Sequence, residues 1–179
     1  MAQVKHAFVS AKADDPDSAL VNPSDWNANH AGIEVIRKTA LETVINSITL
    51  QDDDHLLLAL AANEVWEFEG TLLLTGAETG DFKMAFTIPS GATISWSALG
   101  LLGPATAENQ LVTSNVIEAS GAAITFGVLN GKKIPVIFRG VVVNGATAGN
   151  LQLQWAQSVS DGSGTVIHIN SYLKAYRES

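Results

Sequence analysis

The sequence has 179 residues, which is long enough for one domain with a sizeable hydrophobic core, alone or with a short arm. It contains 10 Lys and Arg against 18 Asp and Glu, and the resulting net charge of −8 argues against nucleic acid and against an anionic membrane surface as the main partner. There is no cysteine, so disulfides, cysteine nucleophiles, zinc knuckles and iron–sulfur clusters are excluded.

Residues 1 to about 31 are predicted to form an extended arm that is not part of a sheet core. Ser, Asp, Asn and Pro gather there, and these residues favour turns. Residues 13–18 predict one turn. Residues 22–27 predict a second turn that opens a short helix, with Ser24 as its N-cap, because a hydroxyl can accept from the free amides of a first helical turn. Trp26 lies between polar neighbours, where it packs either on its own domain or on a partner, since tryptophan is a favoured interface anchor.

Beyond the arm the sequence predicts eight to ten short strands and no helix of ordinary length. Residues 64–72 alternate with a period of two, as in a half-buried strand. Trp66 and Phe68 face one side of this strand, whereas Glu67 and Glu69 face the solvated side. Further aromatic residues in strand-like segments are expected to pack in the core: Trp96, Trp155, Phe82, Phe86, Phe126 and Phe138.

Two segments near the end of the chain repeat this alternation. Residues 151–155 predict a strand with its glutamines facing outward. Residues 165–175 predict another strand, with Ile167, Ile169 and Leu173 on one face. Both segments extend the antiparallel pattern to the end of the sequence.

A denser apolar run at residues 134–143 predicts a strand that is covered on both faces. Pro135, near its start, fits only a strand end or an edge. Asn130-Gly131 and Asn144-Gly145 flank the run, and Asn-Gly between apolar runs is a strong hairpin signal. Many short strands with turns rich in Gly and Pro indicate an all-β fold, an antiparallel sandwich of two sheets with jelly-roll connections.

The densest polar cluster is the run at residues 52–55, Asp-Asp-Asp-His. Several carboxylates could bind a hard cation such as Ca²⁺. Consecutive side chains of an extended chain point to opposite faces, however, and the spacing does not match a calcium-binding loop. We therefore expect a solvated turn before a strand at residues 55–60. The same two interpretations apply to Asp14, Asp15 and Asp17.

An enzymatic function has little support in the sequence. Glu64, Glu67 and Glu69 could include the carboxylate pair of a glycoside hydrolase, but the strand alternation already explains them. No zinc hydrolase, serine hydrolase or nucleotide-binding motif is present. The four histidines have no metal-ligand spacing, and we expect surface or interface positions for His6, His30, His55 and His168. The sequence predicts no cofactor, no metal and no catalytic residue.

Charged residues make up 16% of the sequence, against about 25% in typical soluble domains. A subunit that buries surface against copies of itself needs fewer charges, so this composition favours an oligomer. Residues 1–6 lack the apolar core of a signal peptide, and no apolar run approaches the ~18 residues of a membrane span. We therefore expect a soluble chain without an export signal.

The arm resembles the N-terminal segment of many small virion proteins of tailed bacteriophages. These segments carry a short D-W-N-A-x-H signature, which Asp25, Trp26, Asn27, Ala28 and His30 match. The sequence that follows looks like the β-sandwich domains of such proteins at residues 49–68, 80–83 and 89–92. Residues 151–157 and 171–175 look like the closing hairpin of trimeric jelly rolls of the tumour-necrosis-factor and C1q type. The resemblance implies a virion structural role and a homotrimer.

The sequence thus predicts an arm at residues 1–31 and a β-sandwich domain at residues 32–179. The interpretation is a homotrimeric capsid decoration protein in the virion, which binds the major capsid protein or another virion protein through its arm. Decoration is favoured over a fibre because the chain has no collagen-like or coiled-coil shaft. The residues expected to attach the arm are Phe8, Val9, Leu20, Val21, Asp25, Trp26, Asn27 and His30.

Two alternatives stay open. A tail or head fibre tip would bind the host surface through exposed loops such as residues 76–81 and 161–164. A glycan-cleaving enzyme would rest on Glu64, Glu67 and Glu69.

Overall fold

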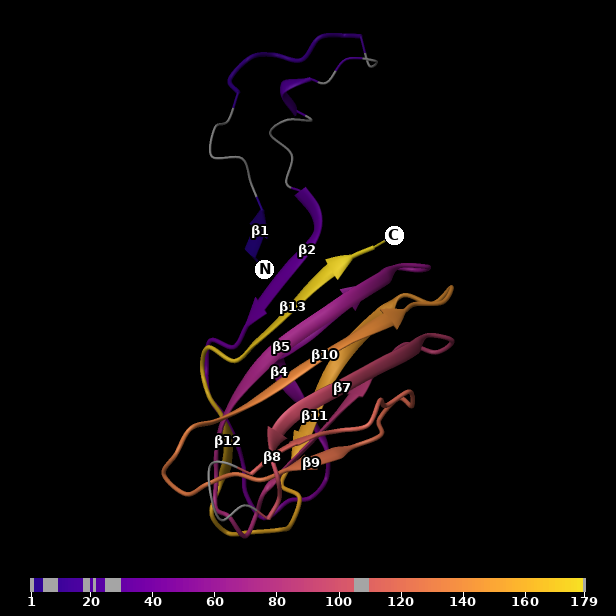
Figure 1. Ribbon diagram of the computed structural model, residues 1–179. Coiled ribbons are helices and arrows are strands. Elements are labelled where there is room, and N and C mark those ends of the chain that lie inside the picture. Colours follow the sequence, from indigo (N-terminus) through magenta and orange to yellow (C-terminus); the bar gives the residue numbers. More distant parts are fainter. Residues whose placement is uncertain are drawn as a thin grey trace.

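The computed structural model describes residues 2–4, 10–17, 20, 22–24, 30–104 and 110–178. Within these residues the fold is all-β, with two antiparallel sheets packed face to face as a sandwich (Figure 1). The described residues contain no helix longer than the two helical positions at Pro23 and Ser24. The prediction of an antiparallel β-sandwich is confirmed.

The larger sheet contains nine strands in the described residues, in the order β1-β2-β13-β5-β10-β7-β8, with β12 pairing β3 and β5. Its strands are β1 (Ala2–Val4), β2 (His30–Arg37), β3 (Glu42–Val44), β5 (Val65–Thr75), β7 (Thr93–Leu101), β8 (Leu111–Thr113), β10 (Ile134–Val143), β12 (Thr165–Ile167) and β13 (Tyr172–Arg177). The smaller sheet has the order β4-β11-β6-β9. Its strands are β4 (Gln51–Leu60), β6 (Phe82–Thr87), β9 (Ile124–Phe126) and β11 (Gly149–Ala156).

Successive strands alternate between the two sheets. The chain passes from β4 in the smaller sheet to β5 in the larger one, and then to β6 and β7 in the same way. It repeats this alternation from β9 through β10 and β11 to the C-terminal strands. Strands that are consecutive in sequence therefore face each other across the core, which is the jelly-roll arrangement.

The core between the sheets is aromatic. The Phe86 ring lies 5.2 Å from the Phe68 ring, 5.3 Å from the Phe138 ring and 5.0 Å from the Trp96 ring, in edge-to-face geometry. Such pairs add to the stabilisation that apolar burial provides. Gly140 makes room for them, because a Cβ there would lie 2.8 Å from the Phe68 ring and 2.5 Å from Trp96 Cβ. The aromatic residues that were predicted for the core are all buried.

Two strand predictions differ from the structure near the end of the chain. Residues 165–175 form β12 and β13 rather than one strand, because the backbone turns at Asn170, which has a φ of 71°. Ile169 therefore lies in a turn and is 45% exposed instead of sharing the buried face. Gln152 was predicted to face solvent but is buried, and its Nε2 donates to Asp53 O at 3.0 Å and to Leu153 O at 2.8 Å.

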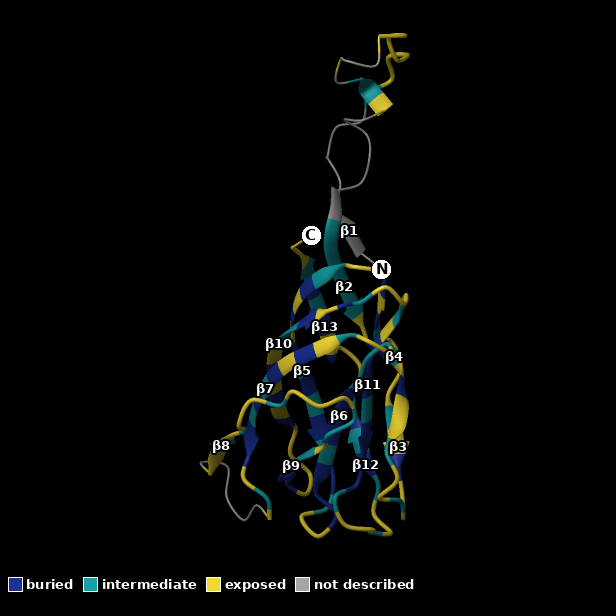
Figure 2. Ribbon diagram, turned by 90° about the vertical axis from the view of Figure 1, so that its right-hand side faces the viewer, coloured by how far each residue is buried: buried dark blue, intermediate teal, exposed yellow. Residues whose placement is uncertain are grey.

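The predicted burial of β10 on both faces is wrong for the single chain. Buried and exposed positions alternate along the strands of the larger sheet (Figure 2). Ile137 and Val143 point away from the core and are 49% and 45% exposed. The sequence is apolar on both faces of β10, but one chain covers only the inner face.

Candidate functional site

The predicted attachment arm is described only in part. Residues 10–17 and 22–24 lie beyond the end of β2, apart from the two sheets, and most of them are exposed (Figure 2). Leu20 is 54% exposed. His30 begins β2 and pairs with Val4 of β1. The other predicted attachment residues lie outside the described residues: Phe8, Val9, Val21, Asp25, Trp26 and Asn27.

Side chains of the arm organise its own turn. Asp14 Oδ1 accepts a hydrogen bond from Ser24 N at 2.9 Å, and Asn22 Oδ1 accepts one from Asp15 N at 2.8 Å. The bonds from Ser24 hold the pKa of Asp14 below its usual range. Pro23 and Ser24 are both helical, so Ser24 lies inside the turn. The amides of the first helical turn that its hydroxyl was predicted to cap belong to residues 25–29, which lie outside the described residues, so the capping role stays a prediction.

The arm begins and ends at the edge of the larger sheet. β1 pairs antiparallel with β2, with Ala2 opposite Val35 and Val4 opposite His30. The chain thus leaves the sheet after β1 and returns to it at the start of β2. The sequence did not predict a strand in the arm, because three residues are too short to show a periodicity.

The outer face of the larger sheet carries an open hollow of about 460 Å³. Glu67 and Glu69 of β5 line it together with Arg139 of β10 and Tyr176 of β13. Arg139 lies opposite Glu69 in the strand register, and Lys174 Nζ lies 3.7 Å from Glu69 Oε1. This face therefore presents charges of both signs beside apolar side chains.

Glu64 does not line this hollow, because three donors hold its carboxylate elsewhere. Its Oε2 accepts hydrogen bonds from Trp66 Nε1 at 3.0 Å and from Ala61 N at 2.8 Å, and its Oε1 accepts from Arg177 at 2.9 Å. Burial alone would raise the pKa of Glu64, but these donors outweigh it and lower the pKa. The three glutamates of the predicted carboxylate group therefore do not point into one site.

Two loops that the sequence singled out meet at the end of the sandwich opposite the arm (Figure 1). Thr79 donates a hydrogen bond to Asp161 Oδ2 at 2.5 Å, and this bond lowers the pKa of Asp161. The amides of Ser158 and Val159 donate to Gly80 O at 3.0 and 2.9 Å. These bonds fix the two loops against each other.

Exposed apolar side chains border this loop end. Ile45 and Ile48 are each 52% exposed, and Val159 is 57% exposed. The backbone between the two isoleucines is tied to the second loop, because Asn46 N donates to Asp161 O at 3.0 Å. The loop end is thus a second surface at which apolar side chains reach solvent.

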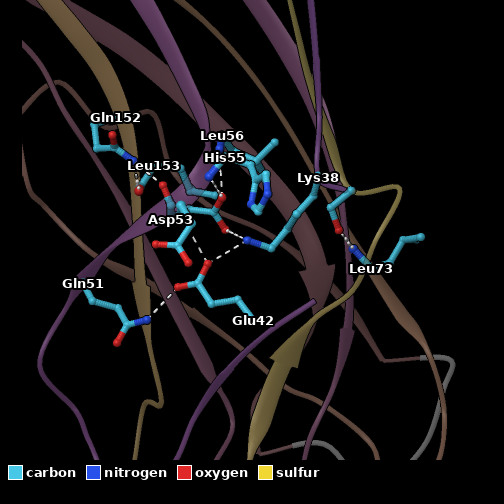
Figure 3. A network of polar contacts seen from close by, with 11 residues as sticks. Lys38, Glu42, Gln51, Asp53, His55, Leu56, Leu73, Gln152 and Leu153 are labelled. Carbon is cyan, nitrogen blue, oxygen red and sulfur yellow. Dashed lines mark hydrogen bonds and ion pairs between the residues drawn. The ribbon is translucent and has the colours of Figure 1, made fainter. Parts of the chain in front are cut away.

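A buried cluster of three charged side chains joins the two sheets (Figure 3). Lys38 follows β2, Glu42 opens β3, and Asp53 lies in β4. Lys38 Nζ lies 2.6 Å from Asp53 Oδ2 and 2.7 Å from Glu42 Oε2. The side chains of Lys38 and Asp53 are 0% exposed, and that of Glu42 is 10% exposed. Burying an ion this completely is costly unless it is paired, so the three charges depend on one another.

The second oxygen of Asp53 is held by the backbone. Asp53 Oδ1 accepts hydrogen bonds from His55 N at 2.9 Å and from Leu56 N at 2.8 Å. The register between β4 and β11 shifts here, so residues 53–56 of β4 lie opposite Leu153 of β11. This bulge turns the two amides toward the carboxylate instead of toward the neighbouring strand.

Glu42 is fixed by three donors. Besides Lys38, Gln51 Nε2 donates to its Oε1 at 2.6 Å, and Asp54 N donates to its Oε2 at 3.2 Å. Burial by itself would raise the pKa of Glu42, but the bonds from Lys38, Asp54 and Gln51 outweigh it and lower the pKa. Glu42 is therefore an ionised carboxylate directly beside the Lys38 ammonium.

The prediction of a solvated turn at residues 52–55 is wrong. These residues are part of β4, which begins at Gln51. Alternation along the strand leaves Asp52 and Asp54 exposed and turns Asp53 into the core. The ammonium of Lys38 faces Asp53 there.

The described residues contain no group of three or more His, Asp or Glu side chains that could hold a metal ion. His168 accepts or donates one hydrogen bond with Thr75 Oγ1 at 2.8 Å, and burial lowers its pKa. In the same part of the chain no helix is long and apolar enough to cross a membrane. His6 lies outside the described residues.

No protein-family model and no curated protein matches this sequence. Among solved structures, the chain aligns with that of the infectious bursal disease virus Gx strain at 8% identity and a TM-score of 0.25, covering 95% of this chain and 46% of that one. It aligns with the VP2 subviral particle of infectious bursal disease virus at 10% identity and a TM-score of 0.24, covering 96% and 43%. The chain thus spans less than half the length of these structures.

Sequence reasoning missed Lys38 and Glu42. A single lysine after a strand resembles any solvated lysine, and its partner Asp53 is 15 positions away in the sequence. The signal that could have indicated the cluster is the alternation of β4 itself, which must turn at least one of three consecutive aspartates inward. A buried aspartate requires a partner of opposite charge or several donors.

Proposed function

We propose that this chain is a structural protein of a tailed-bacteriophage virion, a homotrimeric decoration protein that binds the capsid through residues 1–31. The sandwich is the folded body and the arm makes the attachment. The proposal includes no catalytic turnover. Its partners are two further copies of the chain and the major capsid protein or another virion protein.

The observation that carries the proposal is the open outer face of the larger sheet. β10 is apolar on both faces, yet Ile137 and Val143 are exposed in the single chain. Arg139 lies opposite Glu69 on the same face, so a second copy can meet both apolar groups and opposite charges there. The low charged fraction of 16% fits a chain that buries this face against itself.

The arm supports attachment in a different way. Its described part lies apart from the sandwich, Leu20 is exposed, and its sequence carries the D-W-N-A-x-H signature (Figure 1). Burying its apolar side chains on a neighbouring protein supplies roughly 25 cal/mol per Å². Three arms on one trimer convert a modest affinity into firm attachment through avidity.

Light scattering coupled to size-exclusion chromatography tests the oligomer. We expect a mass of three times 18.8 kDa. A monomer at micromolar concentration would contradict the trimer. It would also show that the outer face of the larger sheet is not a contact between copies of the chain. The arm signature alone would then support a virion role.

Co-sedimentation with capsids assembled without this protein tests the attachment. Replacing residues 5–29 by a Gly/Ser linker keeps β1 and β2 but removes the arm, and we expect binding to be lost. Leu20→Ser should weaken binding several-fold, whereas Leu41→Ser, at a similarly exposed leucine of the sandwich, should leave it unchanged. Unchanged binding of the linker variant would rule out attachment through the arm.

A second candidate function is recognition of the host surface by the loop end. The loops at residues 76–81 and 161–164 are bonded to each other opposite the arm, so a virion protein held by its arm would present them outward (Figure 1). Binding of the isolated wild-type protein to host cells, lost on Val159→Asp, would favour this function. Absence of cell binding, together with capsid binding, would favour decoration.

A further inference from the structure

The buried cluster of Lys38, Asp53 and Glu42 has the arrangement that amide formation requires. We propose that Lys38 and Asp53 become joined by an intramolecular isopeptide bond, formed when Lys38 Nζ attacks Asp53 Cγ and one water molecule leaves. Glu42 transfers the protons. The reaction is a single self-modification of the folded chain and does not depend on a virion role.

The nucleophile and the electrophile are already in contact. Lys38 Nζ lies 2.6 Å from Asp53 Oδ2, and Asp53 Cγ is one bond further away. Both side chains are 0% exposed and are fixed by the two sheets. Groups held together in this way react with effective molarities of about 10⁵–10⁸ M, which overcomes the slow reaction of an amine with a carboxylic acid in water.

The other carboxyl oxygen lies in an oxyanion-binding position. Asp53 Oδ1 accepts from the amides of His55 and Leu56 at 2.9 and 2.8 Å. Two backbone donors on one oxygen polarise the carbonyl and stabilise the negative charge of a tetrahedral intermediate. An ion pair with Lys38 needs only Oδ2, so the amides on Oδ1 prepare the carbon for attack.

Glu42 supplies the base. Its Oε2 lies 2.7 Å from Lys38 Nζ, and donors on both of its oxygens keep it in place. A general base has to reach the proton that it removes at hydrogen-bond distance, and Glu42 does so. Its side chain is 10% exposed, which gives the cluster a route to solvent for the released water.

The step balances without any further reactant. The Lys38 ammonium first passes one proton to Asp53 Oδ2 across their 2.6 Å contact, which gives a neutral amine and a carboxylic acid. The amine attacks Cγ, and the negative charge develops on Oδ1. Glu42 takes a proton from the nitrogen and delivers it to the hydroxyl at Oδ2. The bond from Cγ to Oδ2 breaks, water leaves, and Glu42 is again a carboxylate.

The intact mass of the wild-type chain, measured after denaturation, tests the proposal. We expect it to be lower than the sequence mass by one water molecule, and peptide mapping should find a branched peptide that joins residues 38 and 53. A wild-type chain that keeps its full sequence mass after prolonged incubation in the folded state would overturn the proposal. This outcome does not depend on the folding of any variant.

Variants locate the bond. Lys38→Arg and Asp53→Ala should have the full mass, whereas Asp53→Asn should lose one ammonia in place of one water. Glu42→Gln keeps the pair but not the base, so it should fold and keep its full mass. Glu64→Gln is the matched control at a glutamate outside the cluster, and it should lose water as the wild type does. A mass loss that persists in Lys38→Arg would overturn the assignment.

Discussion

Lys38 and Asp53 connect the two sheets of the sandwich, since Lys38 follows β2 of the larger sheet and Asp53 lies in β4 of the smaller one. β2 is also the strand at which the arm enters the sandwich. A force on the arm therefore reaches β2 first. A covalent bond at Lys38 would pass that force to the smaller sheet instead of leaving it on the hydrogen bonds between β2 and β13.

A buried Asp53 carboxylate without a basic partner should destabilise this region. Lys38→Met leaves Asp53 in that state, and the uncompensated buried charge should cost about 3–5 kcal/mol of the free energy of unfolding. Adding Asp53→Asn removes that charge while its side-chain oxygen still accepts from His55 N and Leu56 N. The double variant should therefore recover much of the loss in urea unfolding. Neither variant can form the isopeptide bond, so the comparison isolates the charge, and a double variant no more stable than Lys38→Met would contradict it.

The outer face of the larger sheet should control the oligomeric state. Ile137→Glu places a charge on this face, where a second copy would bury it, and should convert the proposed trimer into a monomer in light scattering. Ile45→Glu makes the same change at a residue of similar exposure, 52% against 49%, at the loop end. It should leave the mass unchanged. If Ile45→Glu dissociates the trimer and Ile137→Glu does not, the subunit contact lies at the loop end.

The sequence predicted the parts of the fold that depend on local pattern. The alternation at residues 64–72 gave the faces of β5 correctly, and the aromatic residues of the core were recognised. Asn130-Gly131 indeed turns the chain, with Gly131 at a φ of 69° and Leu129 bridged to Lys132. These features can be predicted from the sequence because each depends on residues that are close together in the chain.

The remaining features depend on contacts between distant segments. Lys38 and Asp53 meet because the two sheets pack, and no local pattern indicates that packing. Asn170 interrupts an otherwise regular apolar alternation with one positive φ, which asparagine tolerates better than most residues. The outward side chains of β10 were predicted to be buried because several of them are apolar, but the single chain leaves Ile137 and Val143 exposed.

Glu64 should contribute stability that depends on pH. Its pKa is lower in the folded chain than in the unfolded one, so its contribution is present at neutral pH and is lost as the pH falls through its folded pKa. Glu64→Gln weakens the bonds from Trp66 and Arg177 and should cost about 1 kcal/mol at pH 7 in urea unfolding. The difference from the wild type should shrink toward pH 3. A difference that is constant between pH 7 and pH 3 would show that the charge of Glu64 contributes nothing.

The contribution of Asp81 to stability should depend on pH in the opposite direction to that of Glu64. Burial raises its pKa, so the folded chain favours the protonated carboxyl, and the stability from this group is lost as the pH rises through its folded pKa. Asp81→Asn removes the buried charge, keeps an oxygen for the Val128 amide and suits the backbone φ of 48°. It should be slightly more stable than the wild type at pH 7, and this advantage should disappear toward pH 4.

Asp161→Asn, in the neighbouring loop, is the control for this prediction. Hydrogen bonds lower the pKa of Asp161, so the variant should be less stable than the wild type at neutral pH. If both variants shift stability in the same direction at pH 7, burial is not what distinguishes these two aspartates.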